Sequence, residues 1–108
     1  MTVIEFLGDS LDVLRAFPPS ARQRAGYQLD RVERGLEPND WKPMPAIGRG
    51  VKEVRVQAEA GAFRVIYFVL GQDAVYVLHC FQKKSRRTSR PDIELATRRY
   101  KDLLKALR

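Results

Sequence analysis

Residues 51–81 read VKEVRVQAEAGAFRVIYFVLGQDAVYVLHCF and contain three runs rich in β-branched and aromatic side chains. We expect these runs to form the strands Val51–Gln57, Ala62–Leu70 and Ala74–Phe81. The separators are only a few residues long, so each connection must be a hairpin between antiparallel strands. The sequence therefore predicts an antiparallel sheet in which the most apolar run, Ala62–Leu70, is the central strand.

The residues before this sheet predict a short strand and two helices. Thr2–Phe6 alternates β-forming residues, as a strand does. Residues 11–17 place apolar side chains at helical spacing and end at two prolines. Residues 20–36 form a second helix that Ser20 can cap and that Gly35 and Pro38 close, so the two helices form a hairpin. The buried stripe of the second helix is expected to contain Ala21, Ala25, Leu29, Val32 and Leu36.

The remaining segments complete the expected fold. Residues 39–50 contain two prolines and two glycines, so we predict a connecting loop that Trp41 and Met44 anchor to the core. Ser89 and Asp92 have the spacing of a capping box and begin a closing helix. The order β-α-α-β-β-β-α predicts an α+β fold: a small antiparallel sheet with an N-terminal helical hairpin and a C-terminal helix packed on it. We expect one domain, residues 1–108, with the helices on one face of the sheet.

The excess positive charge is concentrated at one end of the chain. The whole sequence has a formal net charge of +7, and residues 82–108 account for all of it. The densest cluster, Lys83-Lys84-Ser85-Arg86-Arg87, directly follows the last expected strand. A strand that ends in clustered cations is suited to bind a polyanion, and nucleic acid is the first candidate. The alternative is a solvated strand end whose lysines prevent aggregation.

Several functional classes lack their sequence signature. No apolar stretch approaches the ~20 residues that span a bilayer, and the first residues lack the basic region of a signal peptide, so we expect a cytoplasmic protein. One His and one Cys are too few for a structural zinc site. The sequence also contains no glycine-rich phosphate loop. We therefore expect neither a metal nor a cofactor, and RNA cleavage by the substrate's own 2′-OH stays feasible.

Arg64 is the strongest candidate for a functional side chain because it interrupts the most apolar run of the chain. Strand alternation places it on the face opposite Phe63 and Val65. If Val56 pairs with Phe63, Arg55 lies directly beside Arg64, and two opposed cations repel each other unless an anion lies between them. The alternative is that Glu53 or Glu59 forms an ion pair with Arg64 and nothing further happens.

The residues after the central strand supply further candidates, each with an ordinary structural alternative. Lys83 and Lys84 can supply charge to a phosphate, and a desolvated lysine can act as a base. Phe81 can stack on a base or belong to the core. His79 can transfer protons or be packed and hydrogen-bonded, since Val75 and Val77 are expected on its face. The exposed cations expected to contact the phosphate backbone from a basic loop are Arg86, Arg87 and Arg90. Cys80 is expected beside Leu78 on the inner face, where it is inert.

Four segments of the sequence resemble the RelE/HigB toxin superfamily, and in particular its phage-derived branch of host-inhibition proteins. They are GVKEVRV (50–56), FRVIY (63–67), VLHCFQKKS (77–85) and DIELA (92–96). The resemblance implies the toxin of a type II toxin–antitoxin pair, which cleaves mRNA on the ribosome without a metal. It also implies a small HigA-like antitoxin with a helix-turn-helix as the cognate partner.

The resemblance also assigns roles to individual residues. Arg64 matches the central-strand arginine that stabilises the phosphate in the transition state. Lys83 and Lys84 match the basic positions after the last strand, and Arg55 matches a basic position on the preceding strand. The sequence departs from many active members of the superfamily because no Tyr or His near its C-terminus matches their proton-transfer residue.

Two other functions use the same residues without catalysis. The basic end can belong to a module that binds RNA or DNA and does not cut it, in which case binding is salt-sensitive and yields no products. The chain can also be an interaction protein whose basic C-terminus docks an acidic partner.

Overall fold

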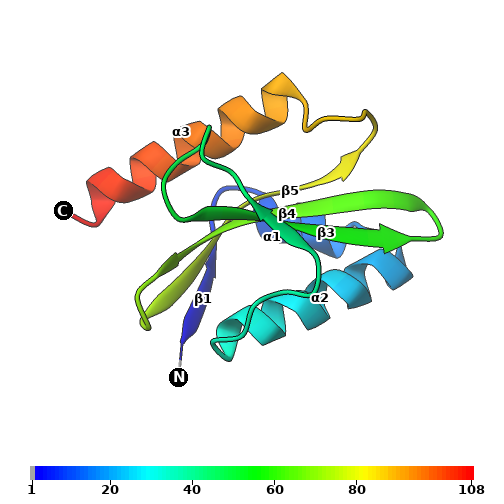
Figure 1. Ribbon diagram of the computed structural model, residues 1–108, viewed down its shortest axis with the longest axis horizontal. Coiled ribbons are helices and arrows are strands. Elements are labelled where there is room, and N and C mark those ends of the chain that lie inside the picture. Colours follow the sequence, from blue (N-terminus) through cyan, green and yellow to red (C-terminus); the bar gives the residue numbers. More distant parts are fainter. Residues whose placement is uncertain (1) are drawn as a thin grey trace.

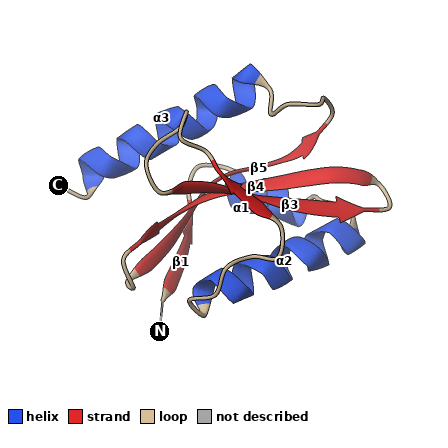
Figure 2. Ribbon diagram, in the orientation of Figure 1, coloured by secondary structure: helices blue, strands red, loops and turns tan. Residues whose placement is uncertain are grey.

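The computed structural model describes residues 2–108 and contains a five-stranded sheet between two helical layers (Figure 1, Figure 2). In chain order the elements are β1 (Val3–Phe6), α1 (Ser10–Arg15), α2 (Pro19–Glu33), β2 (Trp41–Pro43), β3 (Val51–Ala58), β4 (Gly61–Leu70), β5 (Ala74–Lys83) and α3 (Arg90–Ala106). The α+β class and the two predicted hairpins are confirmed. None of the described helices is long and apolar enough to cross a membrane.

The sheet has the strand order β1-β5-β4-β3-β2, with β4 at its centre as predicted. β1 pairs with β5 in parallel, and the other three pairings are antiparallel. The prediction of an unbroken loop over residues 39–50 is wrong, because Trp41–Pro43 forms the short edge strand β2 against β3. A proline is tolerated there because an edge strand has one side without a partner.

The prediction that all helices share one face of the sheet is also wrong. α1 and α2 cover one face, where they pack on Phe63, Val65 and Tyr67 of β4. α3 covers the other face, where Tyr100 and Leu103 join the cluster that contains Ile66. A central strand that is apolar on both faces needs a layer on each, because a single layer would leave half of its side chains in water.

The boundaries of α2 differ from the predicted ones at both ends. The helix begins at Pro19 with Pro18 as its N-cap residue, so Ser20 lies within the helix and does not cap it. Proline suits the first turn because its fixed φ is helical and the first N–H groups have no helical acceptor. At the other end Gly35 adopts φ +84° and turns the chain away, which leaves Leu36 51% exposed instead of buried.

A β-bulge in β5 changes which residues face α3. The register pairs Ile66 with His79 but Tyr67 with Val77, so Leu78 is the additional residue. The prediction that His79 shares a face with Val75 and Val77 is therefore wrong. His79 pairs with Ile66 on the face that α3 covers, whereas Val75 and Val77 pack beneath α1 and α2. Cys80 packs in the cluster beneath α1 and α2, whereas Leu78 packs in the cluster beneath α3, so these two residues also lie on opposite faces.

Arg99 of α3 stabilises this bulge. Its Nη1 donates a 2.9 Å hydrogen bond to the Leu78 carbonyl, and its Nη2 lies 2.7 Å from Asp9 Oδ1. The guanidinium passes over Gly8, where a Cβ atom would lie 2.5 Å from its carbon. Gly8 also adopts φ +55°, in the left-handed region that favours glycine. Three parts of the fold thus depend on one another: the turn that precedes α1, the helix α3, and the bulge in β5.

We predict that Gly8→Ala lowers the free energy of unfolding by about 1–3 kcal/mol, because it strains the backbone and displaces Arg99 from the Leu78 carbonyl. Urea denaturation measures the change. Gly26→Ala is the matched control: Gly26 lies inside α2 with open space around its Cα, so alanine should raise stability by about 0.5–1 kcal/mol. Equal stability of the wild-type protein and Gly8→Ala would contradict this account of the bulge.

Candidate functional site

The candidate site lies on the α3-facing side of the sheet, where three strands bring polar side chains into register. Arg55 of β3 pairs with Arg64 of β4, as predicted, and Arg64 in turn pairs with Phe81 of β5. The neighbouring row contains Glu53, Ile66 and His79. Lys83 pairs with Ala62, two residues before Arg64 on the same face. Both predicted neighbours of Arg64, Arg55 and Lys83, are therefore present beside it.

Arg64 is buried, with 9% of its surface exposed. Its Nη1 donates a 2.9 Å hydrogen bond to the Phe63 carbonyl, and its Nε lies 3.5 Å from Glu53 Oε1. Neither Arg64 Nε nor Glu53 Oε1 makes a hydrogen bond to any group within residues 2–108. Burial lowers the pKa of the Arg64 guanidinium, and the Glu53 carboxylate opposes that shift. The predicted alternative, a pairing with Glu53, is thus present as an ion pair, and it leaves an Arg64 donor unused.

Glu53 is the fully buried carboxylate at the centre of this site. Its Oε2 accepts a 2.6 Å hydrogen bond from Thr88 Oγ1, and its Oε1 lies 3.9 Å from Lys42 Nζ. Thr88 is itself buried and lies in the segment that connects β5 to α3, just before the N-cap residue Ser89. Glu53 therefore connects three parts of the fold: the edge strand β2, the central strand β4 and the basic segment before α3.

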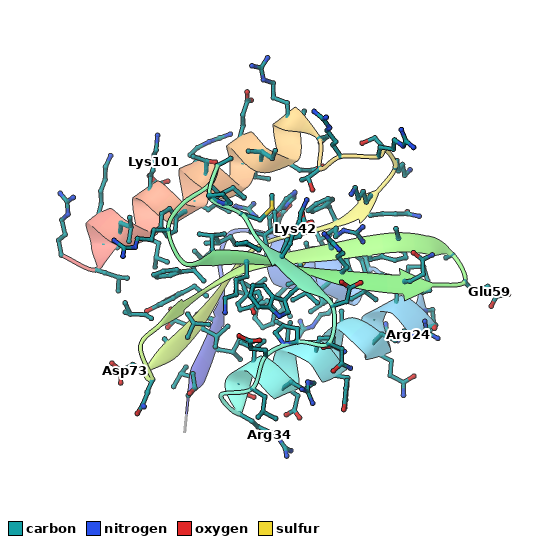
Figure 3. The ribbon with its side chains drawn as sticks, viewed as in Figure 1. Arg24, Arg34, Lys42, Glu59, Asp73 and Lys101 are labelled. Atoms are coloured by element: carbon teal, nitrogen blue, oxygen red, sulfur yellow. The ribbon has the colours of Figure 1, made fainter. Side chains whose placement is uncertain are left out.

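Four basic side chains surround Glu53 and form what we call the basic corner: Lys42, Arg55, Arg64 and Lys83. Figure 3 shows Lys42 on β2, in front of the sheet. Arg55 is half-exposed, and its Nη1 lies 3.5 Å from Asp40 Oδ1. Burial lowers the pKa of the Lys83 ammonium, and the nearby charge of Arg64 lowers it further. Two carboxylates do not balance four cations, so the corner has an unmet demand for negative charge.

The other predicted cations lie outside this corner. Lys84, Arg86 and Arg87 are exposed in the segment between β5 and α3. The prediction that Arg90 lies in the basic loop is wrong, because Arg90 is the first residue of α3. Its Nε lies 3.7 Å from Glu94 Oε1. These side chains can attract a polyanion from solution, and their exposure leaves them well hydrated.

The side chains of His79 and Phe81 are buried between the sheet and α3. His79 Nε2 lies 2.7 Å from Asp92 Oδ1 of α3, and the imidazole stacks on Phe81 with ring centroids 4.9 Å apart. Both residues are 7% exposed. Of the two interpretations of each residue, the structure favours the packed, hydrogen-bonded histidine and the core phenylalanine. The proposed stacking of Phe81 on a substrate base has to be corrected, because the ring lies in the core beneath α3.

Sequence reasoning missed three contacts of this site. The sequence predicts a loop at Lys42, whereas the residue lies in β2. The alternation of polar and apolar side chains around Trp41 and Pro43 is the signal that indicates a strand there. Thr88 gave no signal, since a threonine between basic residues does not indicate a carboxylate 35 residues away. Asp92 was predicted as a capping residue, and Ser89 does accept a hydrogen bond from its N–H, but the pairing of Asp92 with His79 was not foreseen.

The chemistry available to the site is that of cations around a small anion. Two guanidinium groups from neighbouring strands and two ammonium groups converge where a phosphate would balance their charge and accept hydrogen bonds from them. Among residues 2–108 no group of three His, Cys, Asp or Glu side chains is placed to hold a metal ion.

Comparisons with known proteins agree on the family and on the fold. Residues 12–101 match the family model described as "Phage derived protein Gp49-like (DUF891)". A solved structure of the E. coli toxin RelE, a double mutant in the free state, superposes with a TM-score of 0.51 at 15% sequence identity, over 99% of this chain and 98% of that one. No curated protein matches the sequence. The predicted resemblance is thus confirmed for the family and for the RelE-like fold.

We predict that Thr88→Val destabilises the protein by about 1–3 kcal/mol, because the buried Glu53 carboxylate loses its short hydrogen bond. The segment that carries Arg86 and Arg87 should also loosen, so trypsin should cleave it faster. Thr97→Val is the matched control, because Thr97 Oγ1 donates to the Ile93 carbonyl within α3 and not to a charged group. Equal trypsin cleavage of the two variants would argue against the Thr88–Glu53 connection.

We predict that Cys80 is unreactive in the folded protein. Burial beneath α1 and α2 raises the pKa of its thiol to about 12, and only the thiolate attacks disulfide reagents. At pH 8 the native protein should react with 5,5′-dithiobis(2-nitrobenzoic acid) on the order of a thousandfold more slowly than the chain unfolded in urea. Rapid native reaction would show that Cys80 is accessible.

Proposed function

We propose, from the premise that this chain belongs to the phage-derived Gp49-like family, that it is the toxin of a type II toxin–antitoxin system and acts as a metal-independent, ribosome-dependent mRNA endoribonuclease. The observation that supports this activity most directly is the basic corner: Arg55 and Arg64 are register neighbours, and Lys83 lies on the same face. Glu53 and Asp40 each lie 3.5 Å from one of the two opposed guanidinium groups and do not balance all the cations of the corner, and the scissile phosphate supplies the missing negative charge.

The proposed reaction is an internal transfer at phosphorus. The 2′-OH of one nucleotide attacks the adjacent phosphate, a new P–O2′ bond forms, and the P–O5′ bond to the next nucleotide breaks. The 2′-OH gives up its proton as the P–O2′ bond forms, and the departing 5′ oxygen takes up a proton from solvent. The products are a 2′,3′-cyclic phosphate and a free 5′-OH. Negative charge builds up on the non-bridging oxygens during the attack, and Arg55 and Arg64 stabilise it by charge-assisted hydrogen bonds.

Lys83 is the best candidate for the group that accepts the proton from the 2′-OH. An amine accepts a proton only in its neutral form, and both burial and the charge of Arg64 lower the pKa of Lys83. Lys84, which was predicted together with Lys83 to supply charge to a phosphate, is exposed beyond the end of β5. We therefore assign Lys84 to electrostatic attraction of the RNA, together with Arg86 and Arg87.

Glu53 is a positioning residue in this proposal. Its carboxylate lies beside Arg64 Nε and so orients the guanidinium. The same carboxylate accepts a hydrogen bond from Thr88 and so holds the basic segment between β5 and α3 beside the corner. A phosphate that enters the corner competes with Glu53 for the same guanidinium. Arg64 Nε is buried against Glu53, so the phosphate has to contact the Nη groups of the guanidinium and leaves the carboxylate in place.

The proposed partners are those whose negative charge complements the exposed cations and the basic corner of this protein. The ribosome and mRNA are polyanions, and the exposed cations between β5 and α3 can guide the protein to them. The proposed antitoxin is a HigA-like protein with a helix-turn-helix. It would neutralise the toxin by covering the basic corner, so we expect its contacting segment to carry Asp and Glu.

We predict that Lys83→Met and Arg55→Gln each reduce mRNA cleavage about 10²-fold or more, because the first removes the group that accepts the 2′-OH proton and the second removes a charge that stabilises the transition state. Both side chains are partly exposed, so these variants should fold. Arg64→Ala is a weaker test, since it leaves the buried Glu53 without its cation and is expected to destabilise the fold. Arg64→Lys retains a charge and should stay folded with reduced activity.

The measurement is inducible expression in a bacterial host with growth curves and mapping of mRNA 5′ ends, with and without co-expression of the proposed antitoxin. Arg98→Gln is the control, because Arg98 is an exposed arginine of α3 away from the basic corner. Undiminished cleavage by folded Lys83→Met and Arg55→Gln would refute the assignment of the site. RNA binding that is salt-sensitive but yields no new 5′ ends would favour the non-catalytic binding module.

A further inference from the structure

A hollow lies on the other side of β3 from the basic corner. Its volume is about 400 Å³, within the range of small-molecule sites, and it lies between α2 and the β3 segment from Arg55 to Gln57. Arg24 of α2 donates a hydrogen bond to the Gln57 carbonyl and connects the helix with the strand. In Figure 3 Arg24 lies at the same end of the molecule as Glu59, on the β3–β4 hairpin.

The open edge of β3 connects this hollow with the basic corner. β2 covers only Lys52–Val54, and the Arg55 N–H then donates to the Asp40 carbonyl. Beyond that bond no described strand pairs with this edge of β3, whose other edge pairs with β4. Arg55 therefore belongs to both places: it is the register partner of Arg64, and it lines the hollow. A strand of RNA held at the corner can pass around this edge without crossing a protein layer.

The side chains of the hollow have the chemistry of a nucleobase site. Tyr27 of α2 is 55% exposed, and among residues 2–108 it is the one aromatic side chain with a large exposed surface. Around it lie the amides of Gln23, Gln28 and Asn39. Gln28 Oε1 accepts a hydrogen bond from the Asn39 N–H, so the amide group of Gln28 keeps its two N–H donors for another partner. An exposed ring gives a base a surface to stack on, and amides pair with its edge.

We propose that the hollow beside Tyr27 binds the base of a nucleotide next to the linkage held at the basic corner. The base stacks on the Tyr27 ring, the amides contact its edge, and Arg55 bridges to the phosphate between the two sites. This inference rests on the proposed function for its substrate, RNA, and adds a subsite that positions the strand. The occupant is a base and not a peptide because the hollow combines an exposed ring with amides and shares a cation with a phosphate site.

The test is an NMR titration of the full chain with three probes: adenosine 5′-monophosphate, ribose 5-phosphate and inorganic phosphate. Adenosine 5′-monophosphate should shift the amide signals of residues 23–28 and 39 together with those of Arg55 and Arg64. The two probes without a base should shift only the signals of the basic corner. Tyr27→Ala should weaken the binding of the nucleotide about tenfold, whereas Tyr27→Phe, which retains the ring, should bind within about twofold of wild type. Leu36→Ala, at an exposed apolar position after α2, is the control and should change nothing.

The outcomes separate this subsite from the proposed function. If adenosine 5′-monophosphate shifts the basic corner but not residues 23–28, the subsite is wrong and the phosphate site stands. If ribose 5-phosphate shifts residues 23–28 equally, the hollow binds anions and not bases. If none of the probes shifts either region, both proposals fail. A Tyr27→Ala variant that cleaves mRNA normally but escapes its antitoxin would assign the hollow to the protein partner and overturn the subsite.

Discussion

The arrangement of the functional face depends on one buried carboxylate. Glu53 has no exposed surface and lies among Lys42, Arg64 and the hydroxyl of Thr88. Burying an unpaired carboxylate or an unpaired guanidinium costs much free energy. Glu53 and Arg64 lower this cost for each other because each supplies the opposite charge. The same group fixes where the edge strand, the central strand and the basic segment meet. Because it neutralises only part of the surrounding charge, the fold retains a strong local demand for an anion.

This balance explains why the site is found on a strand that would otherwise be a plain core element. β4 needs apolar residues on both faces because helices cover both, and Arg64 replaces one of them. The loss of apolar burial is offset by the ion pair with Glu53 and by the hydrogen bond to the Phe63 carbonyl. The central strand also makes the site rigid, because a guanidinium there is held far more firmly than one on a loop. The role proposed for Arg64 requires this, since a group that stabilises a developing charge has to be in place beforehand.

The parts of the fold that sequence reasoning predicted are those determined by local periodicity. Strand alternation and short connections predict the two hairpins, and the pairing of Arg55 with Arg64 follows once Val56 and Phe63 share a face. The failures involve interactions between distant residues. The bulge at Leu78 depends on Arg99 of α3 and on the room left by Gly8, so the face of His79 could not be derived from β5 alone. The Thr88–Glu53 bond and the strand Trp41–Pro43 likewise depend on partners that local patterns do not indicate.

The distribution of net charge along the sequence does not show where the basic corner lies. The excess of cations lies after residue 81, yet only Lys83 of that segment belongs to the basic corner, while Lys42, Arg55 and Arg64 come from the part of the chain that is neutral overall. The two sets act over different ranges. Exposed cations act through solvent over about a Debye length of 8–10 Å and bring a polyanion to the surface. Half-buried cations in register act at contact distance, where the dielectric is low and geometry decides which atom is stabilised. A sequence shows the first set directly as composition, whereas the second set becomes visible only once strand register is known.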